Sequence, residues 1–325
     1  MDVRLEEILR PIAPQLTDFE ERLKSFLSAR SAFVYQVSEH ILTRRGKRLR
    51  PAFVFLSSGQ MAADPQRAML AALAVELIHT ATLLHDDVID LSSTRRGQPT
   101  VNSKWNNLVS VLMGDYLFSK AFRLLVQAEN VDLVESFSQA TERVSLGQLA
   151  EIQHSNNFDI SEADYFSLIA DKTASLFAVS CEAGGILAGR PVSEREKIRE
   201  FGEKVGVAFQ ISDDLLDIVG TEAVTGKTVG NDLREGKVTL PLIYALSNGG
   251  SSRRSEILSL LGKGAENGEA EKVARIILDS GGVEYAQKKA LAYGQEAFDL
   301  LEELPATEFK KSLEEVARFA ALREQ

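Results

Sequence analysis

Two short acidic motifs constrain this chain more than any other feature of its sequence. The segment DDVID at 86–90 follows a long apolar stretch, and DDLLD at 213–217 follows the uncharged run 205–210. In a helix, the first and last Asp of each motif lie about 5–6 Å apart on one face. Two carboxylates at that separation repel each other by about 3 kcal/mol at an effective dielectric constant of 20. Both motifs therefore need water or a cation beside them.

The composition of the motifs favours a magnesium site. Mg²⁺ prefers oxygen ligands, keeps several waters and often connects carboxylates to phosphates. One such motif alone is more simply a solvated helix end, but two copies beside apolar sequence favour metal binding. The chain has neither His/Cys spacing for zinc nor a GxGxxG motif. The candidate metal ligands are Asp86, Asp87, Asp90, Asp213, Asp214 and Asp217.

Basic residues around the acidic motifs predict a diphosphate site. The chain has 37 Lys and Arg against 47 Asp and Glu, a net charge of −10, which argues against a nucleic-acid partner. Any phosphate-binding site must therefore gather its basic residues locally. His79 lies two helical turns before the first motif, where a phosphate contact competes with an ordinary core position. The candidate phosphate ligands are Lys47, Arg50, Arg95, Arg96, Lys172, Lys227 and Lys237.

The scarcity of proline predicts an all-α fold. There are eight prolines, and none lies within 100–190, 192–240 or 242–304. Asp64 and Ser161 are expected N-caps, and a full capping box is expected at Ser193. Continuous helices are expected over 17–42 and 162–189, among others. No linker or change of composition divides the chain, so one domain over 1–325 is expected.

The cellular location is expected to be the cytoplasm. Cys181 is the single cysteine, so no intrachain disulfide can form, which fits a reducing compartment. The first sixteen residues are too charged for a signal peptide. No run of about 18 uncharged apolar residues is found, so no transmembrane segment is expected.

Several ordered segments together resemble the trans-isoprenyl diphosphate synthases, the polyprenyl synthetase family. The resemblance extends from about Gly46 to Pro241. The matching segments are GKRLRP at 46–51, LLHDDVIDLSSTRRG at 83–97, GDYLF at 114–118, GQLAE at 147–151, KTASLF at 172–177, FQISDDLLD at 209–217 and GKTVGNDLREGKVTLP at 226–241.

The resemblance implies a single-domain bundle of helices around a central apolar cavity. It also implies a transferase of isoprenoid biosynthesis that joins an allylic diphosphate to isopentenyl diphosphate with Mg²⁺. The enzyme would be a homodimer with peripheral membrane contact for product release. Thr173 and Gln210 would lie near the developing carbocation.

The resemblance further assigns the charged residues to two substrates. The allylic diphosphate would be held through metal by Asp86, Asp90 and Asp213, with Asp87, Asp214 and Asp217 in support. The same diphosphate would contact Arg95, Lys172, Lys227 and Lys237, whereas isopentenyl diphosphate would contact Lys47, Arg50, His79 and Arg96.

The product is expected to be a long-chain, octaprenyl-type diphosphate for a quinone side chain. Short-chain members of the family often carry aromatic residues five and four positions before the first Asp, whereas this chain has Ala81 and Thr82. These small residues can also be ordinary packing positions. Geranylgeranyl or farnesyl diphosphate synthase, a terpene cyclase and a regulatory subunit of a heteromeric synthase are the alternatives. The bases Lys47, Arg50 and Arg96 argue against a cyclase, and two intact acidic motifs argue against a regulatory subunit.

Ala81→Phe tests the expected chain length. An aromatic ring adds bulk that a packed wall absorbs only with strain of about 1–3 kcal/mol, so the ring is expected to enter the cavity. Labelled products separated by chromatography should then be shorter than those of the unchanged enzyme, while Thr82→Ala should leave the length unchanged or slightly greater. A wild-type product distribution from Ala81→Phe would show that residue 81 does not line the cavity.

Overall fold

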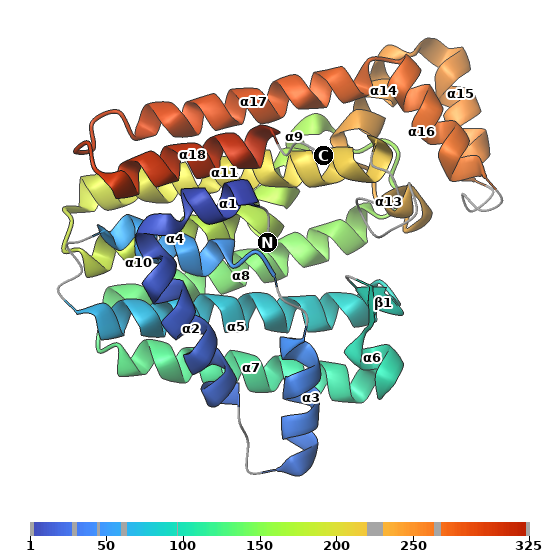
Figure 1. Cartoon of the computed structure of the whole chain (residues 1–325). Coiled ribbons are helices and arrows are strands. Elements are labelled where there is room, and N and C mark those ends of the chain that lie inside the picture. Colours follow the sequence, from blue (N-terminus) through green and yellow to red (C-terminus); the bar gives the residue numbers. More distant parts are fainter. Residues whose placement is uncertain are drawn as a thin grey trace. The chain divides into compact units, whose positions relative to one another are not determined.

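The computed structural model describes residues 3–27, 31–43, 46–59, 64–95, 97–219, 230–262 and 268–322, and Figure 1 shows its elements. The all-α prediction is confirmed, with one short hairpin as the exception. Contacts divide the chain into two compact units, each made from three separate segments. The first unit comprises Met1–Thr141, Leu176–Gly202 and Glu303–Val316, and the second comprises Glu142–Ser175, Glu203–Glu302 and Ala317–Gln325. The expected single domain over 1–325 stays a prediction.

The first unit contains the N-terminal helices and the hairpin. Its elements are α1 (Val3–Ile8), η1 (Arg10–Ile12), α2 (Ala13–Leu27), α3 (Ala32–Leu42), α4 (Leu49–Ser58), α5 (Pro65–Ile89), β1 (Thr94–Arg95), β2 (Gln98–Pro99), α6 (Val101–Lys104) and α7 (Asn107–Gln127). Three longer helices, which carry the chain from one unit into the other, are α8 (Val131–His154), α11 (Val192–Val219) and α18 (Glu308–Leu322).

Helix α5 is the core helix of the first unit. It begins as expected, because the Asp64 side chain accepts hydrogen bonds from the backbone N–H groups of Gln66 and Arg67, and Pro65 occupies the first turn. The helix packs against α2, α4, α6 and α7, and Figure 1 shows α7 running alongside it. It is long and apolar enough to cross a membrane, but 72% of its most apolar window is buried inside the protein. Such burial is typical of a core helix.

The second unit is built around α9 (Glu162–Ile169) and a cluster of C-terminal helices. One turn of π-helix, η3 (Ala170–Ala174), follows α9 and leads into α10 (Ser175–Leu187), which belongs to the first unit from Leu176 onward. The remaining helices are α13 (Asn231–Arg234), α14 (Leu240–Asn248), α15 (Gly250–Leu261), α16 (Glu269–Asp279) and α17 (Gly282–Leu300). Helix α14 packs against α9, α15, α16 and α17. Ile169 of α9, Ile211 of α11 and Leu240 of α14 belong to one buried core.

Three sequence expectations are wrong in detail. The helix expected over 17–42 is two helices, because Ser31 forms a new N-cap in front of Ala32. The helix expected over 162–189 is interrupted by the π-turn, although its capping box at Ser161 is confirmed. Helix α11 begins at Val192, and the carbonyl of Pro191 accepts its first hydrogen bonds, so Ser193 lies inside the helix and is not the cap.

Candidate active site

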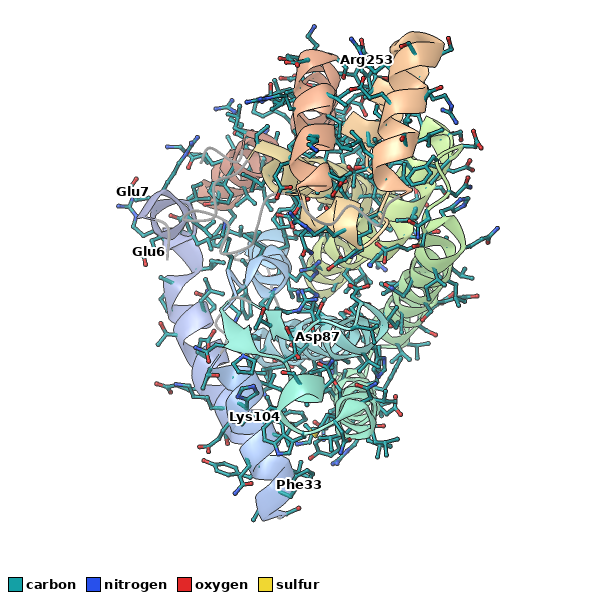
Figure 2. The ribbon with its side chains drawn as sticks, turned by 90° about the vertical axis from the view of Figure 1, so that its right-hand side faces the viewer. Glu6, Glu7, Phe33, Asp87, Lys104 and Arg253 are labelled. Atoms are coloured by element: carbon teal, nitrogen blue, oxygen red, sulfur yellow. The ribbon has the colours of Figure 1, made fainter. Side chains whose placement is uncertain are left out.

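The first acidic motif divides into one buried carboxylate and two carboxylates nearer the surface. The Asp87 side chain is 1% exposed and accepts a 2.6 Å hydrogen bond from Nε of Arg95, which lies in the hairpin. Asp86 and Asp90 are partly exposed. Figure 2 labels Asp87 beside the hairpin ribbon. The Asn102 side chain donates to the backbone carbonyls of Asp87 and Ser92, at 3.1 and 3.2 Å, and so holds the end of α5. Arg95 thus neutralises a buried carboxylate.

Helix α7 fixes the position immediately before this motif. Nε2 of His85 lies 3.1 Å from the carbonyl oxygen of Val111 and 3.4 Å from Oδ1 of Asp115. Gly114 leaves the space that the imidazole fills, because a Cβ at that position would lie 2.2 Å from His85 Nε2. This contact explains two residues of the GDYLF segment. Its glycine leaves room for His85, and its aspartate faces the imidazole ring.

The GKRLRP segment contributes basic residues of two kinds. Arg48 has a left-handed backbone, with φ 53°, and its side chain binds Glu20 at 2.6 Å and Glu76 at 2.5 Å. Burial lowers the pKa of Arg48, but Glu76 and Glu20 together raise it by more, so its pKa lies above the usual value and it stays a structural cation. The partly exposed Arg50 instead places its guanidinium carbon 4.5 Å from the ring centroid of buried Phe177, a cation–π geometry.

The remaining residues of the first unit that were predicted for substrate binding or for product length differ in exposure. Lys47 is exposed, His79 and Thr82 are partly exposed, and Ala81 has 0% exposed surface. The Thr82 hydroxyl donates to the carbonyl of His79 over 2.8 Å. A larger side chain at 81 must therefore displace packed neighbours, while residue 82 already reaches accessible surface. The chain-length role of both residues stays a prediction.

The second acidic motif repeats the division seen in the first. Asp213 is exposed, whereas Asp214 is 4% exposed and lies in a chain of hydrogen bonds. Its Oδ2 accepts from the Tyr165 hydroxyl at 2.6 Å, and its Oδ1 accepts from Gln210 Nε2 at 2.7 Å. Oε1 of Gln210 accepts from the Thr173 hydroxyl at 2.8 Å. Burial is the main cause that raises the pKa of Asp214 to about 6, while the two donors lower it.

The π-turn positions Lys172 and Thr173. Nζ of Lys172 pairs with Oε2 of Glu151, which lies one helical turn after Gly147 in the GQLAE segment. A Cβ on Gly147 would lie 2.4 Å from the backbone nitrogen of Lys172, so α8 and the π-turn are in close contact there. Arg143, one turn earlier, binds Asp171 at 2.7 Å and both oxygens of Glu203 at 3.0 Å. These contacts connect α8, the π-turn and α11.

Asp217 has a structural role in addition to any role with metal. Its two carboxylate oxygens accept backbone N–H bonds from Asn231 and Asp232, each at 3.1 Å, and so cap α13. Burial and the charges of Asp217 and Asp214 raise the pKa of Asp232, and Lys237 lowers it. Nζ of Lys237 binds Glu235 at 2.7 Å.

The structure brings together two groups of predicted residues: Asp87 with Arg95 in the first unit, and Asp214 with Gln210 and Thr173 in the second. Two predicted phosphate ligands, Arg96 and Lys227, lie outside the described residues. The sequence reasoning missed His85, Glu151, Tyr165 and Asp232. The spacing of Gly147 and Glu151 on one helix face was a usable signal for Glu151, whereas no local pattern indicates that Tyr165 contacts an aspartate 49 positions away.

The outer carboxylates of each motif, taken separately, suit a hard divalent cation that receives further ligands from a substrate. Within the described ranges, no three His, Cys, Asp or Glu side chains form a ready-made metal-binding cluster. Asp86, Asp90 and Asp213 nevertheless supply oxygen donors at partly or fully exposed positions. Such donors suit Mg²⁺, which takes one or two carboxylates together with waters and phosphate oxygens.

Comparisons with known proteins agree with this chemistry. The sequence model of the family described as Polyprenyl synthetase matches residues 31–277. The all-trans-nonaprenyl-diphosphate synthase (geranyl-diphosphate specific) of Rhodobacter capsulatus is 37% identical over 321 residues, covering 98% of each chain. The short chain isoprenyl diphosphate synthase of Methanothermobacter thermautotrophicus is 36% identical over 310 residues, covering 94% of this chain and 95% of that protein.

A solved structure extends the similarity to the fold. The polyprenyl synthase of Caulobacter crescentus, complexed with calcium and isoprenyl diphosphate, superposes with a TM-score of 0.93 at 33% identity. The superposition covers 98% of this chain and 97% of that chain.

Gly147→Ala tests the contact between α8 and the π-turn. The added methyl overlaps the Lys172 backbone, so Lys172 and Thr173 must move, and kcat for prenyl transfer should fall by about tenfold or more. Steady-state kinetics with an allylic primer and isopentenyl diphosphate measure this. Gly185→Ala is the matched control, because its Cβ would meet nothing closer than 3.6 Å. Equal kcat values for the two variants would contradict the positioning role.

Proposed function

We propose, from the premise that this chain belongs to the polyprenyl synthetase family and is a prenyltransferase, that it condenses an allylic diphosphate with isopentenyl diphosphate. The proposed product is a long-chain all-trans polyprenyl diphosphate for a quinone side chain, and the proposed cofactor is Mg²⁺. The observation that carries the proposal is the shared construction of the two acidic motifs. In each motif the second Asp is buried and hydrogen-bonded, while the first Asp reaches accessible surface.

This construction suits metal binding by the outer carboxylates. A buried carboxylate that already accepts hydrogen bonds from protein donors orients the helix end and has little surface left for a ligand. We assign metal ligation to Asp86, Asp90 and Asp213, with Asp87 and Asp214 as their support. Bound divalent cations would neutralise the negative charge that develops on the departing diphosphate.

The basic residues are assigned to the two diphosphates. Arg95, Lys172, Lys227 and Lys237 are proposed to bind the allylic diphosphate, and Lys47, Arg50, His79 and Arg96 to bind isopentenyl diphosphate. Lys172 and Lys237 are held by Glu151 and Glu235. These carboxylates keep the ammonium groups oriented before substrate arrives, so less side-chain freedom is lost on binding.

The proposed chemistry needs groups that tolerate a carbocation. The C–O bond of the allylic diphosphate breaks, and its electron pair leaves with the diphosphate. The double bond of isopentenyl diphosphate then attacks the allylic carbon, forming the new C–C bond. A proton is lost to the departed diphosphate, so no dedicated protein base is required. Thr173 and Gln210 offer oxygen lone pairs to the cation, and apolar surroundings exclude water.

The small residues at 81 and 82 support a long product. The two curated relatives do not decide the length, since a nonaprenyl synthase and a short-chain synthase are 37% and 36% identical to this chain. Ala81 and Thr82 put no aromatic ring on this part of α5, one and a half turns before Asp86. The absence of that bulk favours a chain that grows beyond the short-chain limit.

Exposed apolar residues on α7 support a homodimer. Leu108 and Leu112, one helical turn apart, are 74% and 66% exposed, and Val126 lies near the end of the same helix with similar exposure. A row of exposed aliphatic side chains of this kind is typical of an interface, and a second copy would bury it. The single buried Cys181 suits the reducing cytoplasm as the proposed location, with peripheral membrane contact for release of the apolar product.

A condensation assay tests the proposed function. Labelled isopentenyl diphosphate, an allylic primer and Mg²⁺ should give elongated polyprenyl diphosphates, and EDTA in excess should abolish the product until Mg²⁺ is restored. Asp86→Asn should lower kcat/KM by about 100-fold or more, the scale of one preorganised electrostatic group. Asp159→Asn is the matched control, because Asp159 is an exposed carboxylate paired with Arg254.

Three results would separate this proposal from its alternatives. Full turnover in excess EDTA would contradict the metal assignment. Cyclic hydrocarbon products without use of isopentenyl diphosphate would indicate a terpene cyclase. No condensation by the chain alone, restored by a second protein, would indicate a regulatory subunit.

A further inference from the structure

A chain of four polar side chains in the second unit begins at a tyrosine that the proposed chemistry does not use. The hydrogen bonds run from the Tyr165 hydroxyl to Asp214, and from Thr173 through Gln210 to the same carboxylate. We infer that Tyr165 is a positioning residue for prenyl transfer, acting through Asp214 to fix the direction of the Gln210 amide and the Thr173 hydroxyl. The inference rests on the proposed function, in which Thr173 and Gln210 lie beside the allylic cation.

The direction of each hydrogen bond follows from what each group can donate. An ionised carboxylate only accepts, so the NH₂ end of Gln210 must face Asp214. The carbonyl end of the same amide then points to Thr173 and accepts its single hydroxyl proton. Tyr165 occupies the other carboxylate oxygen and so holds the carboxylate in one orientation. The carboxylate thus sets the direction of the Gln210 and Thr173 dipoles, and the Tyr165 hydroxyl holds that carboxylate in place.

This order matters because a carbocation distinguishes the two ends of a dipole. Lone pairs of the Thr173 hydroxyl and the Gln210 carbonyl stabilise positive charge, whereas N–H and O–H protons directed at it raise its energy. With the hydroxyl proton of Thr173 committed to Gln210, the lone pairs of its oxygen remain available. A reversed Gln210 amide would present its N–H protons to Thr173 instead. The fixed order thus prepares the groups before ionisation occurs.

Loss of the tyrosine hydroxyl leaves Gln210 as the remaining side-chain donor, among the described residues, for a carboxylate that is 4% exposed. A buried carboxylate that loses a donor turns toward other partners, and groups bonded to it move with it. Gln210 would lose its fixed acceptor, and Thr173 would lose its fixed acceptor in turn. The main consequence is a defect in the chemical step, because Tyr165, Gln210 and Thr173 are not assigned to hold a diphosphate. Asp214 is assigned only to support the neighbouring ligand Asp213.

Tyr165→Phe isolates the hydroxyl from the ring. The ring is buried and lies 5.5 Å from the ring of Phe166, a contact that phenylalanine preserves. A matched control exists in the same unit: the Tyr285 hydroxyl also donates to a carboxylate, that of Glu162, at 2.7 and 2.9 Å. Tyr285→Phe removes the same chemical group from a tyrosine–carboxylate pair that the proposed function does not use.

The expected result is a separation of kcat from KM. Tyr165→Phe should lower kcat between about 10- and 100-fold, with both KM values within about twofold of wild type. Tyr285→Phe should retain the wild-type kcat. Circular dichroism melting, together with titration of active sites by a single-turnover burst, checks that the Tyr165→Phe protein is folded and counts only competent enzyme.

A double-mutant cycle with Gln210→Ala distinguishes a relay from a structural effect. If Tyr165 acts through Gln210, the double variant should have about the same kcat as Gln210→Ala alone. A wild-type kcat in Tyr165→Phe, or losses that multiply in the double variant, would overturn the inference. Failure of the wild-type enzyme to condense the two substrates would instead overturn the proposed function, so the two failures are distinguishable.

Discussion

A buried carboxylate must receive hydrogen bonds from within the protein, and this constraint organises both acidic motifs. Asp87 receives a guanidinium from Arg95, and Asp214 receives a hydroxyl from Tyr165 and an amide from Gln210. An uncompensated carboxylate in those positions would destabilise the fold by several kcal/mol, about 3–5 for a broken buried pair. The second Asp of each motif is therefore held in one orientation by the protein. The first residue of each is left at the surface, where a cation can reach it.

The second motif depends on an irregular element. A continuous α-helix over 162–187 would change the angular position of every residue after the interruption, since a π-turn adds an extra residue to one turn. The π-turn at Ala170–Ala174 contains both Lys172 and Thr173. Gly147 allows α8 to approach the Lys172 backbone, and Arg143 ties Asp171 to Glu203. Packing from two other helices thus holds a turn that the local sequence does not favour.

Local signals in the sequence predicted two of the helix caps correctly and missed two other helix starts. The N-cap at Asp64 and the capping box at Ser161 are made by side chains that bond within three residues, so the sequence pattern contains all of the interaction. The break before Ala32 was missed because its cap lies in a stretch that otherwise has helical composition. The cap expected at Ser193 is wrong by two positions, because Pro191 precedes the first helical residue, Val192, and its carbonyl accepts the first hydrogen bonds of the helix.

Long-range features could not be predicted in the same way. The acidic motifs themselves were visible, and the partly exposed positions of Asp86 and Asp90 agree with their expected role without testing it. Nothing in the sequence showed that Tyr165 binds Asp214, that Arg95 binds Asp87 or that Asp217 caps α13. These bonds join residues 49, 8 and 14 or 15 positions apart, which the packing of helices or the hairpin after α5 brings together. The π-turn could not be predicted for the same reason, because its contacts with α8 and α11 join distant parts of the sequence.

The surface carboxylates of the two motifs are proposed to bind metal, while the buried ones support them. A crystal structure with Mn²⁺ and an unreactive allylic diphosphate analogue tests this central claim most directly, because anomalous scattering locates the metal. We predict Mn²⁺ peaks within about 2.0–2.3 Å of carboxylate oxygens of Asp86 or Asp90 in the first motif and of Asp213 in the second. Asp87 and Asp214 should keep their bonds to Arg95 and Tyr165. Metal bound directly by Asp87 or Asp214, or peaks at neither motif, would contradict the account.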